Sequence, residues 1–214
     1  ANSKWTRNVK GIDMDKQAFY ASLRAGILGP KLDQNEVDGC EAILAAMAGA
    51  PLAYCAYAFG TAFHETAFTL QPIKELGGPR YFTKMYDVNG DRPALARQNG
   101  NTIPGDGARF FGRGYVQLTW RANYRRAAEK TDFPLEGNPD LALRPDIAAL
   151  IMRSGMDEGW FTGKAFRHYL PGYGPATAEQ FASARRIING TDKAATIAGY
   201  AMKFQAALQA GGWA

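Results

Sequence analysis

Cysteine, histidine and long apolar runs are all scarce in this sequence. Its two cysteines, Cys40 and Cys55, lie within apolar helical stretches, where buried free thiols are common, so a disulfide framework is not expected. The longest apolar candidate, Pro51 to Phe68, contains His64 and Glu65 and falls short of the run of about 18 apolar residues that a membrane span requires. A transmembrane helix is therefore not expected.

The scarcity of histidine also argues against a metal centre. His64 and His168 are the only histidines, and neither belongs to a metal-ligand spacing. The glycine pairs of segment 105–114 are not followed by the Gly-Lys-Ser/Thr of a phosphate-binding loop. We expect no metal and no cofactor. Residues 1–10 lack the apolar segment of a secretory leader, so the chain is cytoplasmic when made or a leader has been removed.

Positive charge is in modest excess. Lys and Arg number 25 against 20 Asp and Glu, which gives a net charge of +5 and favours polyanionic partners such as the bacterial cell wall, anionic lipid or nucleic acid. The basic residues are dispersed among acidic ones, which disfavours nucleic acid. The 214 residues and 46% hydrophobic content predict one continuous domain over residues 1–214.

Helical periodicity dominates the chain. It predicts helices over 13–23, 36–48, 51–65, 121–130, 145–156, 177–188 and 192–209, with Asp13 and Asn35 as caps of the first two. The stretch from Thr66 to Gly114 is punctuated by glycine, so we expect turns and a functional site there. Tyr115 to Thr119 alternates like a strand, which predicts Gln117 and Thr119 on one face. The expected fold class is mainly α (α+β), with a small β element.

Glu65 is the only formally charged residue between Pro51 and Phe68. A carboxylate in such a stretch is unfavourable unless it is partnered or protonated, so Glu65 is either a helix-terminal residue that reaches solvent or a functional acid. A glycosidase needs one protonated carboxyl group and one ionised group. Candidates for the second group are Glu75, Asp87, Asp91 and Asp106.

Three sets of residues follow one another over more than half of the chain. They are Phe63-His64-Glu65-Thr66, then Pro104 to Gly107 with Phe111 to Thr119 and Asn123-Tyr124, and finally Ile187 to Gly190. In type and order they resemble family 19 glycoside hydrolases, which include chitinases and many phage endolysins. The segment from Gly100 to Gly107 is more similar to the phage lysozyme branch than to the plant chitinases.

The resemblance implies a two-lobed, lysozyme-like helical fold beside a saccharide cleft, and an inverting mechanism. Glu65 takes the place of the general acid, and Thr119 takes the place of a residue that holds the attacking water. The residues implied to bind the sugar are His64, Arg113, Gln117, Asn123, Tyr124 and Asn189.

The resemblance leaves the base open between two residues. Glu75 matches the endolysin branch and Asp87 the plant pattern, and we favour Glu75. Plant chitinases also carry an arginine near the middle of the last helix, where this sequence has Ile197, so we claim no catalytic arginine.

The expected function is that of an endolysin, a muramidase that cuts the glycan strands of peptidoglycan. The alternatives are a chitinase acting on N-acetylglucosamine polymers and a catalytically inactive wall-binding module, although the presence of Glu65 and Glu75 argues against inactivity. We expect a monomer without nucleic-acid partner or stable membrane insertion. It would be made in the host bacterial cytoplasm and would act on periplasmic peptidoglycan after release.

Overall fold

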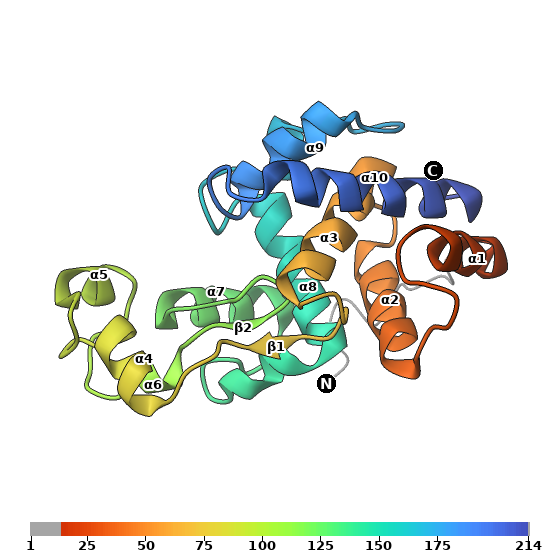
Figure 1. Cartoon of the computed structure of the whole chain (residues 1–214). Coiled ribbons are helices and arrows are strands. Elements are labelled where there is room, and N and C mark those ends of the chain that lie inside the picture. Colours follow the sequence, from red (N-terminus) through yellow and green to blue (C-terminus); the bar gives the residue numbers. More distant parts are fainter. Residues whose placement is uncertain (1–13, 214) are drawn as a thin grey trace.

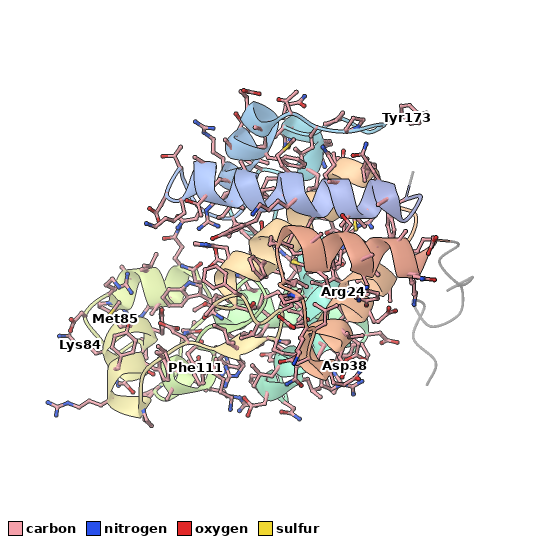
Figure 2. The ribbon with its side chains drawn as sticks, turned by 45° about the vertical axis from the view of Figure 1, so that its right-hand side comes forward. Arg24, Asp38, Lys84, Met85, Phe111 and Tyr173 are labelled. Atoms are coloured by element: carbon pink, nitrogen blue, oxygen red, sulfur yellow. The ribbon has the colours of Figure 1, made fainter. Side chains whose placement is uncertain are left out.

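The computed structural model describes residues 14–213 and is mainly helical. Figure 1 shows α1, α2, α9 and α10 gathered around the central helices α3 and α8, with α4 to α7 and the small sheet on the other side. Figure 2 shows the same division, with Lys84, Met85 and Phe111 at one end and Tyr173 far from them. The predicted mainly α fold class is confirmed. No helix in residues 14–213 is long and apolar enough to cross a membrane.

The first two helices begin at aspartates that cap them. Helix α1 (Lys16–Gly26) starts after Asp15, whose side chain accepts from the N–H of Ala18; the predicted cap, Asp13, lies outside the described residues. Helix α2 (Gln34–Met47) starts after Asp33, which forms a capping box with Glu36, so the predicted cap Asn35 is wrong. A side-chain acceptor at the position that precedes the first helical turn stabilises its free N–H groups.

Helix α3 (Leu52–Glu65) is the centre of the core and ends at the candidate acid. It crosses α10 (Ala194–Ala210), where the ring of Phe59 stacks on Phe204 at 4.9 Å between centroids. Gly60 permits this approach, because a Cβ there would lie 2.8 Å from the backbone nitrogen of Ala201. The packing of α3 against α10 therefore fixes the position of Glu65 at the end of α3.

The segment between Thr66 and Gly114, predicted as turns, contains three short helices. They are α4 (Pro79–Tyr86), α5 (Pro93–Gln98) and α6 (Asp106–Arg109). Proline occupies the first turn of α4 and α5, where its missing N–H has no cost. These helices have only eight, six and four residues and alternate with glycine-containing turns, so the glycine pattern of the segment predicted turns instead.

The strand predicted over Tyr115 to Thr119 is wrong. The sheet consists of β1 (Ile73–Lys74) paired antiparallel with β2 (Arg113–Gly114). The chain then reverses in a tight turn, with positive φ at Gly114 and Gln117, and Leu118 returns to bridge Arg113. Positive φ is incompatible with an extended strand, so alternation does not govern which side chains share a face here.

The remaining helices lie close to the predicted ranges. They are α7 (Arg121–Thr131), α8 (Pro145–Glu158), α9 (Ala178–Ala184) and α10, with 3₁₀ turns η1 (Pro139–Leu143), η2 (Phe166–His168) and η3 (Arg185–Ile187). Helix α9 begins with the predicted capping box of Thr177 and Gln180. Cys40 and Cys55 are buried and free, as predicted, and burial raises the pKa of both thiols.

Replacement of Gly60 by alanine is expected to lower the free energy of unfolding by about 1–3 kcal/mol, because the new methyl group must displace the backbone of α10. Gly199, on α10, is the matched control: a Cβ there meets nothing within 4 Å. Gly199→Ala should leave stability unchanged or raise it by up to about 1 kcal/mol. Urea unfolding measures both variants, and equal effects would contradict the proposed close packing.

Candidate active site

Glu65 is the last residue of α3 and forms an ion pair with Arg185, a residue far away in the sequence. Its Oε1 accepts a hydrogen bond of 2.7 Å from Nη1 of Arg185. Arg185 is 3% exposed, and its Nε donates to the carbonyl of Asp192 at 3.0 Å. No donor within residues 14–213 bonds Oε2 of Glu65, whose side chain is 22% exposed. One carboxyl oxygen is thus held by arginine and the other remains open to a ligand.

Arg185 is a residue that sequence reasoning missed. The sequence has Ile197 where plant chitinases carry an arginine, so no catalytic arginine was claimed. In the structure, Arg185 reaches Glu65 from η3 instead. Arg185 and Arg186 are adjacent, yet Arg185 is buried and Arg186 is exposed. No local pattern distinguishes the two.

Glu75 directly follows β1 and is held through both carboxylate oxygens. The hydroxyl of Tyr86 donates to Oε1 at 2.7 Å, and the backbone N–H of Gly112 donates to Oε2 at 3.1 Å. Burial, and then the contact with Glu75, raises the pKa of Tyr86, so its hydroxyl stays protonated and can donate. Tyr86 comes from α4, a helix that the sequence did not predict, and was also missed.

Asp87, the alternative base, has a different environment. It is 2% exposed; its Oδ2 accepts from the N–H groups of Gly105 and Gly107 at 2.8 and 3.0 Å, and its Oδ1 accepts from Asn89 at 3.1 Å. These bonds hold a loop together and leave no oxygen facing a ligand. The geometry therefore favours Glu75 over Asp87.

The other two acidic candidates are also engaged in structure. Asp106 is buried, pairs with Arg121 and accepts from the backbone N–H of Thr102. Asp91 is exposed and lies 3.6 Å from Lys84. Among the four carboxylates predicted as candidates for the second group, only the side chain of Glu75 is both held by hydrogen bonds and partly exposed to solvent.

Gly112 lies where three predicted site residues converge. A Cβ on this glycine would lie 2.8 Å from Oε1 of Gln117, 3.1 Å from Oε2 of Glu75 and 3.3 Å from Oγ1 of Thr119. The space in front of Gly112 is therefore occupied by polar atoms of all three side chains. The structure brings Glu75, Gln117 and Thr119 together, although the strand alternation that first paired Gln117 with Thr119 is absent.

Hydrogen bonds fix the turn that carries these residues. The amide of Gln117 donates to the carbonyls of Ile73 and Gly114, each at 3.2 Å, which ties the turn to β1. The hydroxyl of Thr119 donates to the carbonyl of Gln117 at 2.8 Å. Asn123 in turn donates to the carbonyl of Thr119 at 2.9 Å.

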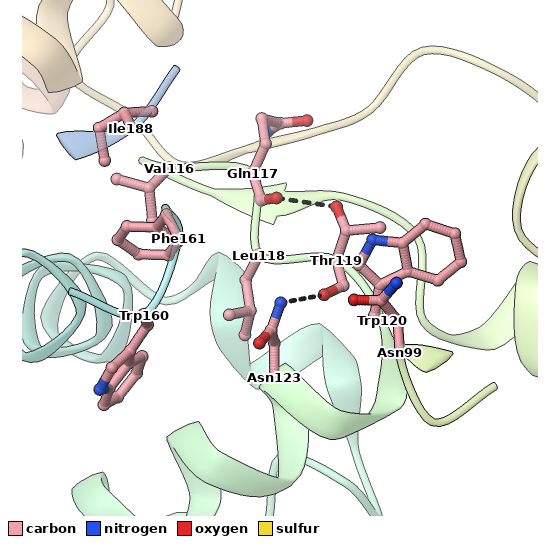
Figure 3. A pocket seen from close by; sticks show the side chains of 10 residues that line it. All are labelled: Asn99, Val116, Gln117, Leu118, Thr119, Trp120, Asn123, Trp160, Phe161 and Ile188. Carbon is pink, nitrogen blue, oxygen red and sulfur yellow. Dashed lines mark hydrogen bonds between the residues drawn. The ribbon is translucent and has the colours of Figure 1, made fainter. Parts of the chain in front are cut away.

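A pocket of about 300 Å³ opens beside this turn (Figure 3). One part of its wall is polar, with Gln117, Thr119 and Asn123, and another part is apolar. The full lining consists of Asn99, Val116, Gln117, Leu118, Thr119, Trp120, Asn123, Trp160, Phe161 and Ile188. A mixed lining of this kind suits a ligand with both polar groups and apolar faces, such as an N-acetylated sugar.

Arg113 and Tyr124, which were expected to bind the sugar, are buried and bonded to the protein. Arg113 donates from Nε to Asp140 at 2.7 Å and from Nη1 to the hydroxyl of Tyr124 at 3.0 Å, while its guanidinium lies 3.7 Å from the ring centroid of Phe111. Tyr124 is 0% exposed. Sugar contacts by these two residues stay a prediction; in the structure their side chains join β2 to α7 and η1.

The other two predicted sugar-binding residues differ from each other. Asn189 is exposed just after η3, and nothing in the structure tests its contact with a sugar. His64 lies next to Glu65, but its Nδ1 is buried and has no hydrogen-bond partner within residues 14–213. An imidazole nitrogen in that position faces the protein interior rather than a ligand.

Unusual backbone conformations cluster around these residues. Ala67, Phe68 and Leu70 have φ of 51°, 74° and 53°, and Gln117 and Trp120 have φ of 51° and 77°. Side chains with a Cβ rarely adopt such angles, and strain of this kind gathers at functional sites. The connection from Glu65 to Glu75 is thus held in one uncommon shape.

Contacts with distant residues maintain this shape. The carbonyl of Leu70 accepts from the hydroxyl of Tyr115 at 3.0 Å and presses against Gly39, where a Cβ would collide with it. The hydroxyl of Thr66 donates to Ala62 and accepts from the N–H of Leu70. The packing of α2 and the turn after β2 therefore hold Leu70, in the connection between Glu65 and Glu75, in place.

Comparison with known proteins places the chain beside chitinases. No protein-family model matches it. A basic endochitinase of Brassica napus is 28% identical over 114 residues, which are 52% of this chain and 38% of that protein. An endochitinase of Arabidopsis thaliana is 32% identical over 84 residues, 39% of this chain and 26% of that protein. The chain thus spans less than two fifths of the length of these relatives.

Solved structures extend the likeness to most of the chain. Chitinase C from Streptomyces griseus superposes with a TM-score of 0.59 at 20% identity, over 94% of this chain and 77% of that one. A bacterial family 19 chitinase gives a TM-score of 0.51 at 18% identity, over 88% and 93% of the two chains. The predicted resemblance to family 19 glycoside hydrolases and the predicted lysozyme-like helical fold are confirmed.

The different environments of Glu75 and Asp87 predict different effects on stability. Asp87→Asn should lower the free energy of unfolding by about 1–3 kcal/mol, because an amide cannot accept all three buried N–H bonds. Glu75→Gln should cost less than half as much, because this side chain is partly exposed and its amide oxygen can still accept. Denaturant unfolding of both variants measures the difference, and a larger loss for Glu75→Gln would contradict the assignment.

Proposed function

We propose that this chain, which shares the fold of the family 19 chitinases and resembles them in the order of its motifs, is an inverting glycoside hydrolase with Glu65 as acid and Glu75 as base. The observation that carries the proposal is the contrast between the two carboxyl groups. Glu65 has one oxygen on Arg185 and one open, and Glu75 is oriented by two donors beside Thr119. Two carboxyl groups in different environments suit the two-carboxylate chemistry of glycosidases, and the inverting course is what the resemblance to family 19 implies.

The geometry supports a role for each side chain in the reaction. Oε2 of Glu65 is available to protonate the glycosidic oxygen. When Glu65 gives up its proton it becomes a carboxylate, and Arg185, already bonded to Oε1, stabilises the new charge. The acid role requires the protonated form of Glu65, with the proton on Oε2 while Oε1 still accepts from Arg185.

Thr119 and Glu75 can share the attacking water. The hydroxyl hydrogen of Thr119 is committed to the carbonyl of Gln117, so its oxygen can only accept from the water. If Glu75 accepts the second water proton, a lone pair of the water oxygen points away from both residues and toward the sugar. Glu75 then removes one proton as the bond to the anomeric carbon forms.

We propose peptidoglycan as the substrate, cut by a monomer that acts in the periplasm after release from the host cytoplasm. The net charge of +5 suits the acidic stem peptides of the wall. The segment from Gly100 to Gly107 resembles the phage branch of the family. Chitin is the second candidate, because the Brassica, Arabidopsis and Streptomyces relatives are named as chitinases.

Glu65→Gln and Glu75→Gln should each reduce hydrolysis by about 10²- to 10⁴-fold, because the amides cannot exchange the required protons. The wild type should release the α-anomer first from a β-linked substrate, as shown by proton NMR before mutarotation. Asp87→Asn is the matched control and should retain activity in the fraction that is folded. Initial β-anomer, or a fully active Glu75→Gln, would rule out the mechanism.

Purified sacculi should be hydrolysed faster than chitohexaose at equal ionic strength, because the lactyl ether and stem peptide of muramic acid add contacts that chitin lacks. Mass spectrometry of the soluble products then identifies the bond: reducing-end muramic acid indicates a muramidase, and reducing-end glucosamine a glucosaminidase. A faster rate on chitohexaose would assign the chain to the chitinases, and no hydrolysis of either polymer would favour a binding module.

A further inference from the structure

Helix α3 carries a row of buried polar atoms that the proposed mechanism does not use. Within residues 14–213, Oη of Tyr57, Oγ1 of Thr61 and Nδ1 of His64 are buried without a hydrogen-bond partner. The three positions follow the i, i+4, i+7 spacing of one helix face. A buried polar group that lacks a partner costs about 1–3 kcal/mol, so such a row in one helix calls for an explanation.

This row leads from the core to the Glu65–Arg185 pair. The opposite face of α3, with Phe59 and Phe63, packs on α10. Tyr57 lies on the face toward Phe166, at 6.2 Å between ring centroids, and Thr61 is one turn before Glu65. Tyr57 and Thr61 are both 0% exposed.

Tyr57 lies two helical turns before Glu65 on the same side of α3, and the charge effects on its pKa agree with this placement. Burial raises the pKa of Tyr57, the neighbouring Thr61 hydroxyl and the Arg185 guanidinium oppose this rise, and the Glu65 carboxylate adds to it. The hydroxyls of Tyr57 and Thr61 are thus neighbours that interact with each other, but within residues 14–213 neither makes a hydrogen bond of good geometry.

The guanidinium of Arg185 has further N–H groups that can donate hydrogen bonds in this region. A guanidinium offers five N–H donors, and its bonds to Glu65 and to the carbonyl of Asp192 use Nη1 and Nε. A buried water is stable where two to four polar groups surround it. Two hydroxyls and a guanidinium with unused N–H groups meet that requirement.

We propose that Tyr57 and Thr61 are positioning residues for the acid, which bind one internal water that also accepts a hydrogen bond from Arg185. The water joins the hydroxyls to the guanidinium and holds the guanidinium against Oε1 of Glu65. This inference rests on the proposed role of Glu65 and adds two residues that never touch the substrate. Loss of either hydroxyl lets Arg185 shift, so the carboxylate formed in the reaction is less well stabilised.

Tyr57→Phe and Thr61→Val should therefore lower kcat about threefold to tenfold and leave KM within twofold, the size expected for one lost hydrogen bond. Tyr20→Phe and Thr131→Val are matched controls, since Tyr20 bonds Glu41 on α2 and the buried hydroxyl of Thr131 bonds Ala127 on α7. The controls should leave kcat unchanged. An unchanged kcat in Tyr57→Phe and Thr61→Val would overturn the proposal.

A second comparison tests whether Tyr57 acts through Arg185. In an Arg185→Lys background the planar fork of donors is gone, so Tyr57→Phe should change kcat by less than twofold there. If Tyr57→Phe lowers kcat by the same factor with and without Arg185, the two residues act independently and the proposed link is wrong.

A readout without activity separates this inference from the proposed function. A high-resolution crystal structure of the wild type should show one ordered water bonded to Oη of Tyr57, Oγ1 of Thr61 and Arg185. In Thr61→Val the water should be absent and the guanidinium displaced. If the enzyme proves inactive on every glycan, this result still decides the inference: a dry site, or an Arg185 that does not move, would overturn it.

Discussion

The ion pair between Glu65 and Arg185 joins residues 120 positions apart and gives the site its asymmetry. It exists because α3 places Glu65 at the end of a buried helix, while the 3₁₀ turn η3, directly after α9, places an almost wholly buried arginine opposite it. A buried charge is tolerated only when it is paired and hydrogen-bonded. Everything on the acid side of the site, including the open oxygen of Glu65, follows from that pairing.

The base side depends on a different constraint, which is the lack of a side chain at Gly112. Glu75, Gln117 and Thr119 can converge only because this position is empty beyond Cα, and Gly112 also supplies the N–H that orients Glu75. The turn that brings Gln117 there has positive φ, and so does the connection that leads away from Glu65. Backbone strain on both sides is offset by the packing of the surrounding helices.

The two acids that remained as candidate bases show how environment decides function. Asp87 and Glu75 are both carboxylates in the same glycine-rich segment, and either could serve as a base by composition alone. Three N–H groups occupy Asp87 and close a loop, whereas a tyrosine hydroxyl and one N–H orient Glu75 at the edge of the polar cluster. The family resemblance left the choice between Glu75 and Asp87 open, and the hydrogen-bond geometry favours Glu75.

The sequence by itself determined the long helices and the mainly helical fold class and identified Glu65 as a candidate acid, because apolar periodicity and an isolated charge are local properties. It could not place Arg185 or Tyr86 at the two carboxylates, nor show that Arg113 and Tyr124 are buried, because those contacts join elements far apart in the chain. It also misread Tyr115 to Thr119 as a strand, since the same alternation of side chains fits a tight turn. Tertiary packing determines which polar groups form hydrogen bonds and which stay exposed. The arrangement of the candidate site could therefore be known only from the tertiary structure.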